Sequence, residues 1–238
     1  MRPVLAIAFL LLMASRLGAQ TPAGEFEIPD LSGNWDADSC LPADGGPCPF
    51  VPEDMPLHPR ARAQMEAFDE PMATKYSCVQ VSLPSLVADP YAFGIQQLAD
   101  RIILTYEKDD VVRTVWLREH GHPEASPYDF TIQGHSMGWY EGETLVIETT
   151  KFAYDPTGLE DLGNVPSSTE KRVMERYRRE GDRLILDLEV EDPVFLTEVT
   201  GFTFQWERTD AELVLPYGCD PARAIEPLKY LPSRWPTD

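Results

Sequence analysis

The chain is short of basic residues and of long apolar runs, and both shortages narrow what it can do. It carries only 20 Lys and Arg against 40 Asp and Glu, which gives a formal charge of −20. This balance argues against nucleic acids, whose phosphates need Lys and Arg, and against anionic membrane surfaces. Beyond residue 14, no apolar stretch approaches the roughly 20 residues that span a bilayer. We therefore expect no membrane insertion by the mature chain.

Common catalytic and cofactor motifs are also missing. The sequence contains no P-loop, no dinucleotide fingerprint and no EF-hand loop. Segment 134–138 (GHSMG) has the letters of a serine-hydrolase motif, but its neighbours predict β-structure instead of a strand-to-helix elbow. We therefore expect no cofactor, and any activity would depend on side chains or a scavenged metal.

Residues 1–19 have the pattern of a cleavable secretory signal. Arg2 supplies a positive charge, residues 4–14 are apolar, and the small residues Gly18 and Ala19 precede Gln20. A retained anchor is the alternative, but the apolar run is about half the length that spans a bilayer. The pattern predicts a periplasmic or secreted protein.

Cysteine is scarce, and its four positions suit an exported protein. Cys40, Cys48, Cys78 and Cys219 all follow the signal, and an even count outside the cytoplasm favours two disulfides. No C-x-x-C pair occurs, which argues against a zinc site. Of the three possible pairings we favour Cys40–Cys48, across a short Pro/Gly loop, with Cys78–Cys219, which would tie the C-terminal tail to the body.

The mature chain divides into three parts. Residues 20–75 are rich in Pro and Gly, with a strand at Gly33-Asn34-Trp35 and a short helix at 59–69. Residues 76–218 predict a β-barrel, and residues 219–238 predict an extended tail. Short β-rich runs separated by polar turns predict strands at 76–82, 92–98, 101–107, 111–118, 128–138, 144–152, 171–179, 183–190, 200–207 and 211–215.

Alternation of apolar and polar residues supports these strands. In 183–190, Leu184, Leu186, Leu188 and Val190 share one face, which is the period of a half-buried strand. An antiparallel meander of eight to ten such strands would tend to close. The fold class is therefore mostly β, a calycin-like barrel with a short N-terminal helix. Segment 153–170 breaks the rhythm and predicts a long loop, which in compact domains is often a lid or a binding loop.

Two resemblances accompany these patterns. Gly33-Asn34-Trp35 resembles the Gly-x-Trp of lipocalins and other calycin-type barrels, which implies a Trp that closes one barrel end. Segment 134–149, with its flanks 100–107, 122–123 and 175–178, resembles a large family of exported, mostly uncharacterised bacterial proteins with the block G-H-S-x-G-x-W-E-G-D-T-L-V-x-[DE]-T. That resemblance implies export and a barrel, but no reaction. The chain departs from the family at Tyr140, where the block has Trp, and at Ser167, where many relatives have His.

Three residues are candidates for catalysis. His135 lies in the Gly-rich block and is either a general acid/base or a side chain that hydrogen-bonds to hold a bend. Glu148 shares a strand face with Val146, opposite Thr149; facing inward it would have a raised pKa and act as a base, and facing outward it would be solvated. Tyr140 is the third candidate.

Aromatic residues on the strands are candidates for ligand binding or for simple core packing. As ligand-binding residues we expect Trp116, Trp139, Tyr106 and Arg176. His120 and His122 could bind a metal if they shared a strand face, but the intervening glycine and following proline favour a turn, so no metal is predicted.

Three functions remain open at this stage. The first is an exported barrel that binds a small, largely apolar molecule. The second is a cofactor-free lyase, isomerase or hydrolase that uses His135 with a strand carboxylate. The third is a structural or interaction module of the cell envelope, which would expose a contiguous apolar patch. The sequence does not indicate an oligomeric state.

Overall fold

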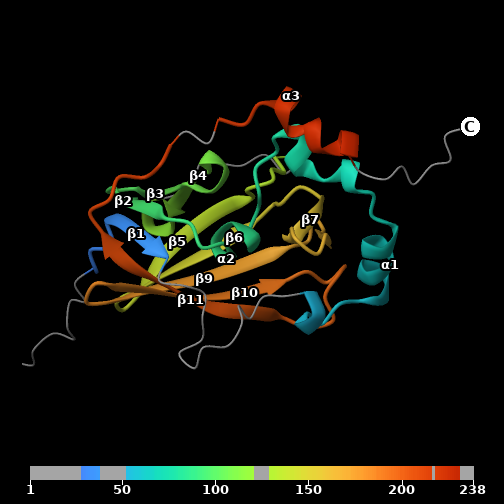
Figure 1. Ribbon diagram of the computed structural model, residues 1–238. Helices are drawn as coiled ribbons and strands as arrows, with labels where there is room; N and C mark the ends of the chain where they lie inside the picture. The colour runs from blue at the N-terminus through green and yellow to red at the C-terminus, as the bar shows by residue number, and fades with distance from the viewer. Residues whose placement is uncertain (1–27, 38–51, 121–128, 216–217, 231–238) are drawn as a thin grey trace, which may run out of the picture.

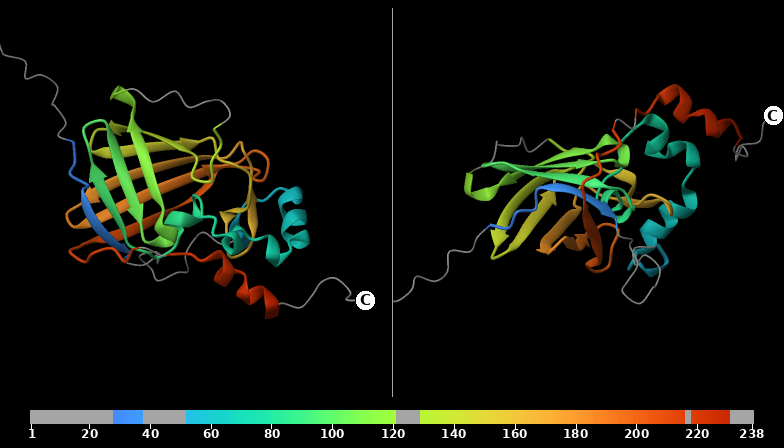
Figure 2. Two further views of the ribbon diagram at one scale, coloured as in Figure 1. Left: turned by 90° about the horizontal axis from the view of Figure 1, so that it is seen from above. Right: turned by 60° about the vertical axis from the view of Figure 1, so that its left-hand side comes forward.

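The computed structural model describes residues 28–37, 52–120, 129–215 and 218–230. The predicted signal at 1–19, the pair Cys40–Cys48 and His122 lie outside these residues. Nine strands close into one barrel, and a separate two-stranded hairpin lies at one end of it (Figures 1 and 2). The barrel strands are β1 (Gly33–Ala37), β2 (Phe93–Gln97), β3 (Arg101–Tyr106), β4 (Val112–Leu117), β5 (His135–Glu141), β6 (Thr144–Thr150), β9 (Arg172–Glu180), β10 (Arg183–Glu191) and β11 (Thr200–Thr209).

The barrel order is β1-β11-β10-β9-β6-β5-β4-β3-β2, and β2 pairs with β1 to close it. The predicted mostly β fold with a closed, calycin-like barrel is confirmed. One pairing departs from the predicted meander, because β4 and β5 run parallel. The predicted strand at 128–138 begins only at His135, since Gly134 has a φ of +65° and donates to the Thr131 carbonyl in a turn.

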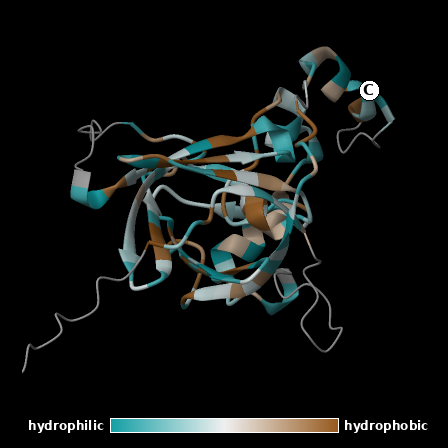
Figure 3. Cartoon of the chain, turned by 90° about the vertical axis from the view of Figure 1, so that its left-hand side faces the viewer, coloured by the Kyte–Doolittle hydropathy of each residue, from teal (hydrophilic) through white to brown (hydrophobic). Residues whose placement is uncertain are grey.

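The inner faces of the strands form the core. Leu184, Leu186, Leu188 and Val190 are at most 2% exposed, which confirms the predicted apolar face of β10. Figure 3 looks into one end of the barrel and shows hydrophobic and hydrophilic residues distributed along the strands that form its wall. Large aromatic rings fill the interior: Phe93 stacks on Tyr106 with centroids 5.2 Å apart, and Trp206 meets Phe93 edge-on at 5.0 Å.

Helices and the hairpin cover one end of the barrel (Figure 1). The hairpin of β7 (Asp155–Glu160) and β8 (Val165–Ser167) occupies most of the segment predicted as a long loop. Beside it lies α1 (Pro59–Ala67), which confirms the predicted helix, and α1 contacts β8. The other helices are α2 (Ser85–Ala88), α3 (Pro221–Ala224) and the 3-10 turns η1 (Pro52–Asp54), η2 (Glu70–Met72), η3 (Thr74–Ser77), η4 (Lys108–Asp110), η5 (Arg118–His120) and η6 (Glu226–Tyr230).

Three segments that were predicted to be extended have other structures: 76–82, 211–215 and the tail after Cys219. Residues 76–82 begin in η3 and turn at Cys78, which has a φ of 53°, and the Val81 amide then donates to the Asp109 carboxylate at 2.8 Å instead of to a strand. Segment 211–215 is likewise held by side chains, with the Val214 amide 2.7 Å from the Glu107 carboxylate. After Cys219 the chain forms α3 and η6, because the Asp220 carboxylate caps α3.

At the opposite end of the barrel, Trp35 is buried beneath two arginines. Its indole N–H donates to the Leu31 carbonyl at 3.0 Å, and the guanidiniums of Arg179 and Arg208 lie 5.8 and 5.9 Å from its ring centroid. Gly33 has a φ of +131°, and a Cβ there would lie 3.2 Å from the Arg208 guanidinium. Because β1 pairs with both β11 and β2, it is part of the barrel, which the predicted boundary at residue 76 left outside.

The disulfide Cys78–Cys219 is present, as predicted, and fastens the C-terminal segment beside η3. Among the helices of the described ranges, none has the length and apolar character needed to cross a membrane.

Candidate functional site

A charged group lies in the middle of the apolar interior. Arg113 on β4 shares one face with the buried Val111, Val115 and Leu117, so its side chain points inward, and it is 3% exposed. Glu175 on β9 is fully buried opposite it. A buried charge is costly unless it is paired and hydrogen-bonded, so the partners of these two residues decide what the group can do.

Arg113 and Glu175 form a two-pronged ion pair. Nη1 and Nη2 of the arginine lie 3.1 and 2.7 Å from the two carboxylate oxygens, the fork geometry that is strongest for this pair. Four hydroxyl groups complete the shell: Arg113 donates to Tyr106 at 3.1 Å, Ser136 at 3.1 Å and Thr149 at 3.2 Å, and Tyr177 donates to Glu175 at 2.9 Å. We call these six residues the arginine cluster.

The two tyrosines and the arginine of the cluster have raised pKa values and stay protonated near neutral pH. Burial raises the pKa of Tyr106 to about 12, partly opposed by the Arg113 charge, and burial also raises the pKa of Tyr177 far above its usual value. Burial alone would lower the pKa of Arg113, but the charge of Glu175 outweighs it and the pKa is raised. Neither tyrosine is therefore a base near neutral pH. Arg113 Nε is buried and has no hydrogen-bond partner in the described part of the chain.

The predicted catalytic residues do not join this cluster. His135 and Glu148 lie on the adjacent strands β5 and β6 and share the outer face, because their neighbours Ser136 and Thr149 point inward. The Glu148 carboxylate lies 2.7 Å from Arg172, an ion pair at the surface. Tyr140 faces the interior, where its hydroxyl accepts a hydrogen bond from Gln97 at 2.8 Å, and burial raises its pKa.

The predicted ligand-binding residues are also divided between the two faces of the barrel. Tyr106 lies inside, within the arginine cluster. Trp116, Trp139 and Arg176 lie outside, where Arg118 stacks on Trp139 at 3.8 Å from the ring centroid and Arg176 lies 3.4 Å from a surface carboxylate. These four side chains therefore do not line one pocket.

A metal site is not formed by the described residues, which contain no group of three or more His, Cys, Asp or Glu side chains placed to hold an ion. His120 belongs to η5, and His122 lies outside the described ranges.

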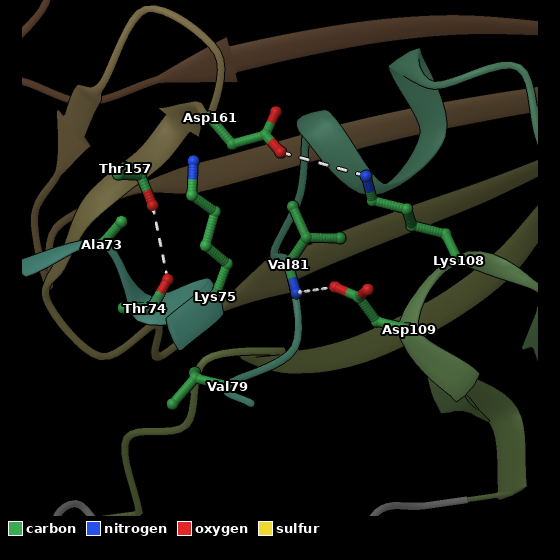
Figure 4. A pocket seen from close by; sticks show the side chains of 9 residues that line it. All are labelled: Ala73, Thr74, Lys75, Val79, Val81, Lys108, Asp109, Thr157 and Asp161. Carbon is green, nitrogen blue, oxygen red and sulfur yellow. Dashed lines mark hydrogen bonds and ion pairs between the residues drawn. The ribbon is translucent and has the colours of Figure 1, made fainter. Parts of the chain in front are cut away.

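A pocket of about 180 Å³ opens at the barrel end that carries β7 (Figure 4). Its walls come from η3, the following loop, η4 and β7, so segments far apart in the sequence meet there. Three lining residues are apolar, two are threonines and four are charged. This end pocket is lined by Ala73, Thr74, Lys75, Val79, Val81, Lys108, Asp109, Thr157 and Asp161.

The charges of the end pocket are partly paired. Lys75 Nζ lies 2.8 Å from the Glu70 carboxylate, and Lys108 is paired with Asp89. Figure 4 shows both lysines directed toward Asp161, whose carboxylate is 3.9 Å from Lys108 Nζ. Burial raises the pKa of Asp161, and the negative charge of Asp89 adds to that effect against the opposing charge of Lys108. The ion pair of Asp161 with Lys108 is therefore a long one, and Lys108 is closer to Asp89.

A buried lysine fixes the wall of the end pocket. Lys171, 1% exposed, donates to the hydroxyl of Ser82 at 2.7 Å and to the carbonyls of Leu83 at 2.7 Å and Gly158 at 2.8 Å. Gly158 follows Thr157, which lines the pocket. Burial lowers the pKa of Lys171 to about 7. Its three N–H donors are fully used, so it holds segments together instead of facing a ligand.

The sequence contained a signal for the arginine cluster but not for the end pocket. Glu175 lies two residues from Val173 and from Tyr177, and Arg113 lies two residues from Val111 and from Val115, so the period of two places both on buried faces. Lys75, Lys108 and Asp161 lie in turns, where no periodicity shows which side chains will meet.

Comparisons of the chain with protein-family models, with curated proteins and with solved structures find no match.

Proposed function

We propose that the protein is an exported barrel that binds a small molecule in the end pocket. The observation that carries the proposal is the pocket itself, a concave site with an apolar wall and a few charged and hydroxyl groups. Its volume of about 180 Å³ is below the roughly 300–1,000 Å³ usual for drug-sized ligands, so the ligand is small. Four charged residues in the lining make the pocket polar. The pocket therefore suits a more polar ligand than the largely apolar one expected from the sequence.

Export belongs to the same proposal. The disulfide Cys78–Cys219 supports it, because such bonds persist mainly in oxidising compartments. The signal pattern of residues 1–19 supports it independently.

The barrel interior supports binding less well than the end pocket does. Trp206, Phe93 and Tyr106 are at most 3% exposed, and both Trp206 and Tyr106 pack against Phe93, so side chains fill this part of the interior. Catalysis by His135 with Glu148 is less well supported too, because Arg172 holds that carboxylate at the outer surface.

The test begins with protein purified without denaturation from the cells that produce it. Mass spectrometry of the intact complex identifies any small molecule that copurifies, and thermal melts measure its effect after removal and return. At 100 times its Kd a ligand stabilises by about 2.7 kcal/mol, which is a shift of about 5–10 °C for a chain of this size.

Two matched variants locate the site. Val79→Trp fills the end pocket, whereas Val112→Trp places the same ring on the exposed outer face of β4. We expect Val79→Trp to abolish the ligand-induced shift and Val112→Trp to retain it. Absence of any bound molecule, or binding that survives Val79→Trp, would overturn the proposal.

A further inference from the structure

We propose that the ligand of the end pocket is a small zwitterion with a short apolar chain, of the kind formed by apolar α-amino acids. This inference rests on the proposed function and specifies its ligand. It follows from the arrangement of charges, hydroxyls and apolar groups around the pocket.

The lining carries equal numbers of the two signs. Two lysines and two aspartates surround one small space, Lys75 and Lys108 with Asp109 and Asp161. A ligand with a single charge would be repelled by one of these pairs. A zwitterion has no net charge and can place each of its charged groups beside the opposite sign, which is how electrostatic complementarity produces specificity.

Lys75 is the cation best placed for the ligand carboxylate. Its side chain is 59% exposed and it uses one of three N–H donors on Glu70, so two donors remain for a second acceptor. Lys108 is less available, because its side chain is only 18% exposed and its ammonium is paired with Asp89.

Asp161 is the anion best placed for the ligand ammonium. Its side chain is 27% exposed, and the nearest lysine nitrogen is 3.9 Å away, beyond hydrogen-bond distance. A carboxylate in this state gains from a cation that comes closer, because charge-assisted hydrogen bonds are about twice as strong as neutral ones. Each aspartate already has one neighbouring donor, the Val81 amide for Asp109 and the Ser85 hydroxyl for Asp161, but Asp161 is the one toward which both lysines are directed (Figure 4).

The rest of the pocket fits the remainder of such a molecule. Ala73, Val79 and Val81 provide an apolar wall for a short side chain. Thr74 and Thr157 lie with their hydroxyl oxygens 3.4 Å apart; Thr157 donates to the Asp155 carboxylate at 3.1 Å and can only accept from a ligand, whereas Thr74 can donate to one. The volume of about 180 Å³ is below the roughly 300–1,000 Å³ usual for drug-sized ligands, which favours a ligand as small as a short-chain amino acid.

Titration calorimetry with four probes of similar size tests the inference. L-Valine carries both charges, isobutylamine only the positive one, isovalerate only the negative one, and isobutanol neither. We expect valine to bind about 10- to 100-fold more tightly than either singly charged probe, the effect of one hydrogen bond to a charged group. Isobutanol should bind most weakly.

Two variants assign the two charges. Asp161→Asn should reduce valine affinity about tenfold or more without weakening isovalerate, and Lys75→Gln should reduce it similarly without weakening isobutylamine, because each change removes a like charge from the singly charged probe. The same changes at exposed positions, Asp182→Asn and Lys229→Gln, should leave all four affinities as they are.

The outcomes separate the inference from the function on which it rests. If valine binds no better than a singly charged probe, or if its binding survives Val79→Trp, the zwitterion is wrong. If no probe binds, the zwitterion is also wrong, while a different copurified molecule that Val79→Trp displaces would leave small-molecule binding in place. If no molecule binds the end pocket at all, both proposals fail.

Discussion

Replacing Arg113 with methionine should destabilise the barrel severely while leaving its shape intact. Methionine fills a similar length but removes the charge, so Glu175 would remain as a buried carboxylate whose hydrogen bond from the Tyr177 hydroxyl does not neutralise its charge. Removal of one member of a buried ion pair costs about 3–5 kcal/mol. For a chain of this size that corresponds to a melting temperature lower by about 6–20 °C.

The double variant Arg113→Met with Glu175→Leu makes the argument quantitative. Because the double variant removes both charges, it should lose clearly less unfolding free energy than the sum of the two single changes. Replacement of both members of a buried ion pair by apolar residues is often near neutral in other proteins. Urea unfolding at neutral pH gives the three free energies of unfolding and hence the coupling energy. The control is Arg101→Met, which removes an exposed arginine and should cost about 0–1 kcal/mol.

Two results would refute this account of the pair. One is a loss below about 1 kcal/mol for Arg113→Met, which would mean that the carboxylate is solvated in the folded protein. The other is strict additivity in the double variant, which would mean that the two charges do not interact.

Three further predictions concern other parts of the fold. Burial lowers the pKa of Lys171 to about 7 from 10.5, so between these pH values the unfolded chain binds a proton that the folded chain lacks, and stability should rise from pH 7 to about 10.5. The difference in unfolding free energy between wild type and Lys171→Met should rise over the same range, and a flat difference would contradict this. Replacing Cys78 and Cys219 with alanine should lower the free energy of unfolding by about 5 kcal/mol relative to the oxidised wild type, the chain-entropy value for a separation of 141 residues. Urea unfolding measures this loss, and the reduced wild type should match the variant. Gly201→Ala should cost more than about 3 kcal/mol, because its Cβ would lie 1.9 Å from a backbone oxygen, whereas Gly181→Ala meets no atom within 4 Å and should cost only about 1 kcal/mol for its positive φ; equal losses would contradict the packing argument.

The barrel could be predicted from the sequence because alternation is a local signal. Each strand with one apolar face, such as 183–190, must bury it, and successive strands of this kind close on one core. The same signal could not show that β4 and β5 run parallel, because that depends on the path of the intervening segment. It also missed β7 and β8, whose residues are buried on both faces and so do not alternate.

The candidate site was much less predictable. His135 and Glu148 stood out by residue type, but their chemistry depends on neighbours that only the closed barrel defines. Lys75, Lys108 and Asp161 come from three turns, and tertiary contacts alone bring them to one pocket. Turn residues have no period, so no pattern in the sequence identifies which of the 40 acidic side chains faces a cavity.

The disulfide between Cys78 and Cys219 also constrains when the molecule can be completed. Its second sulfur belongs to Cys219, which follows every strand of the barrel, so all of these strands must be synthesised before the bond can form. Until then Cys78 lacks its native partner, whereas Cys40 and Cys48 are already in the synthesised chain. The early hazard is therefore a wrong bond among these three cysteines, and an oxidoreductase able to reshuffle such bonds should raise the yield of correctly linked protein.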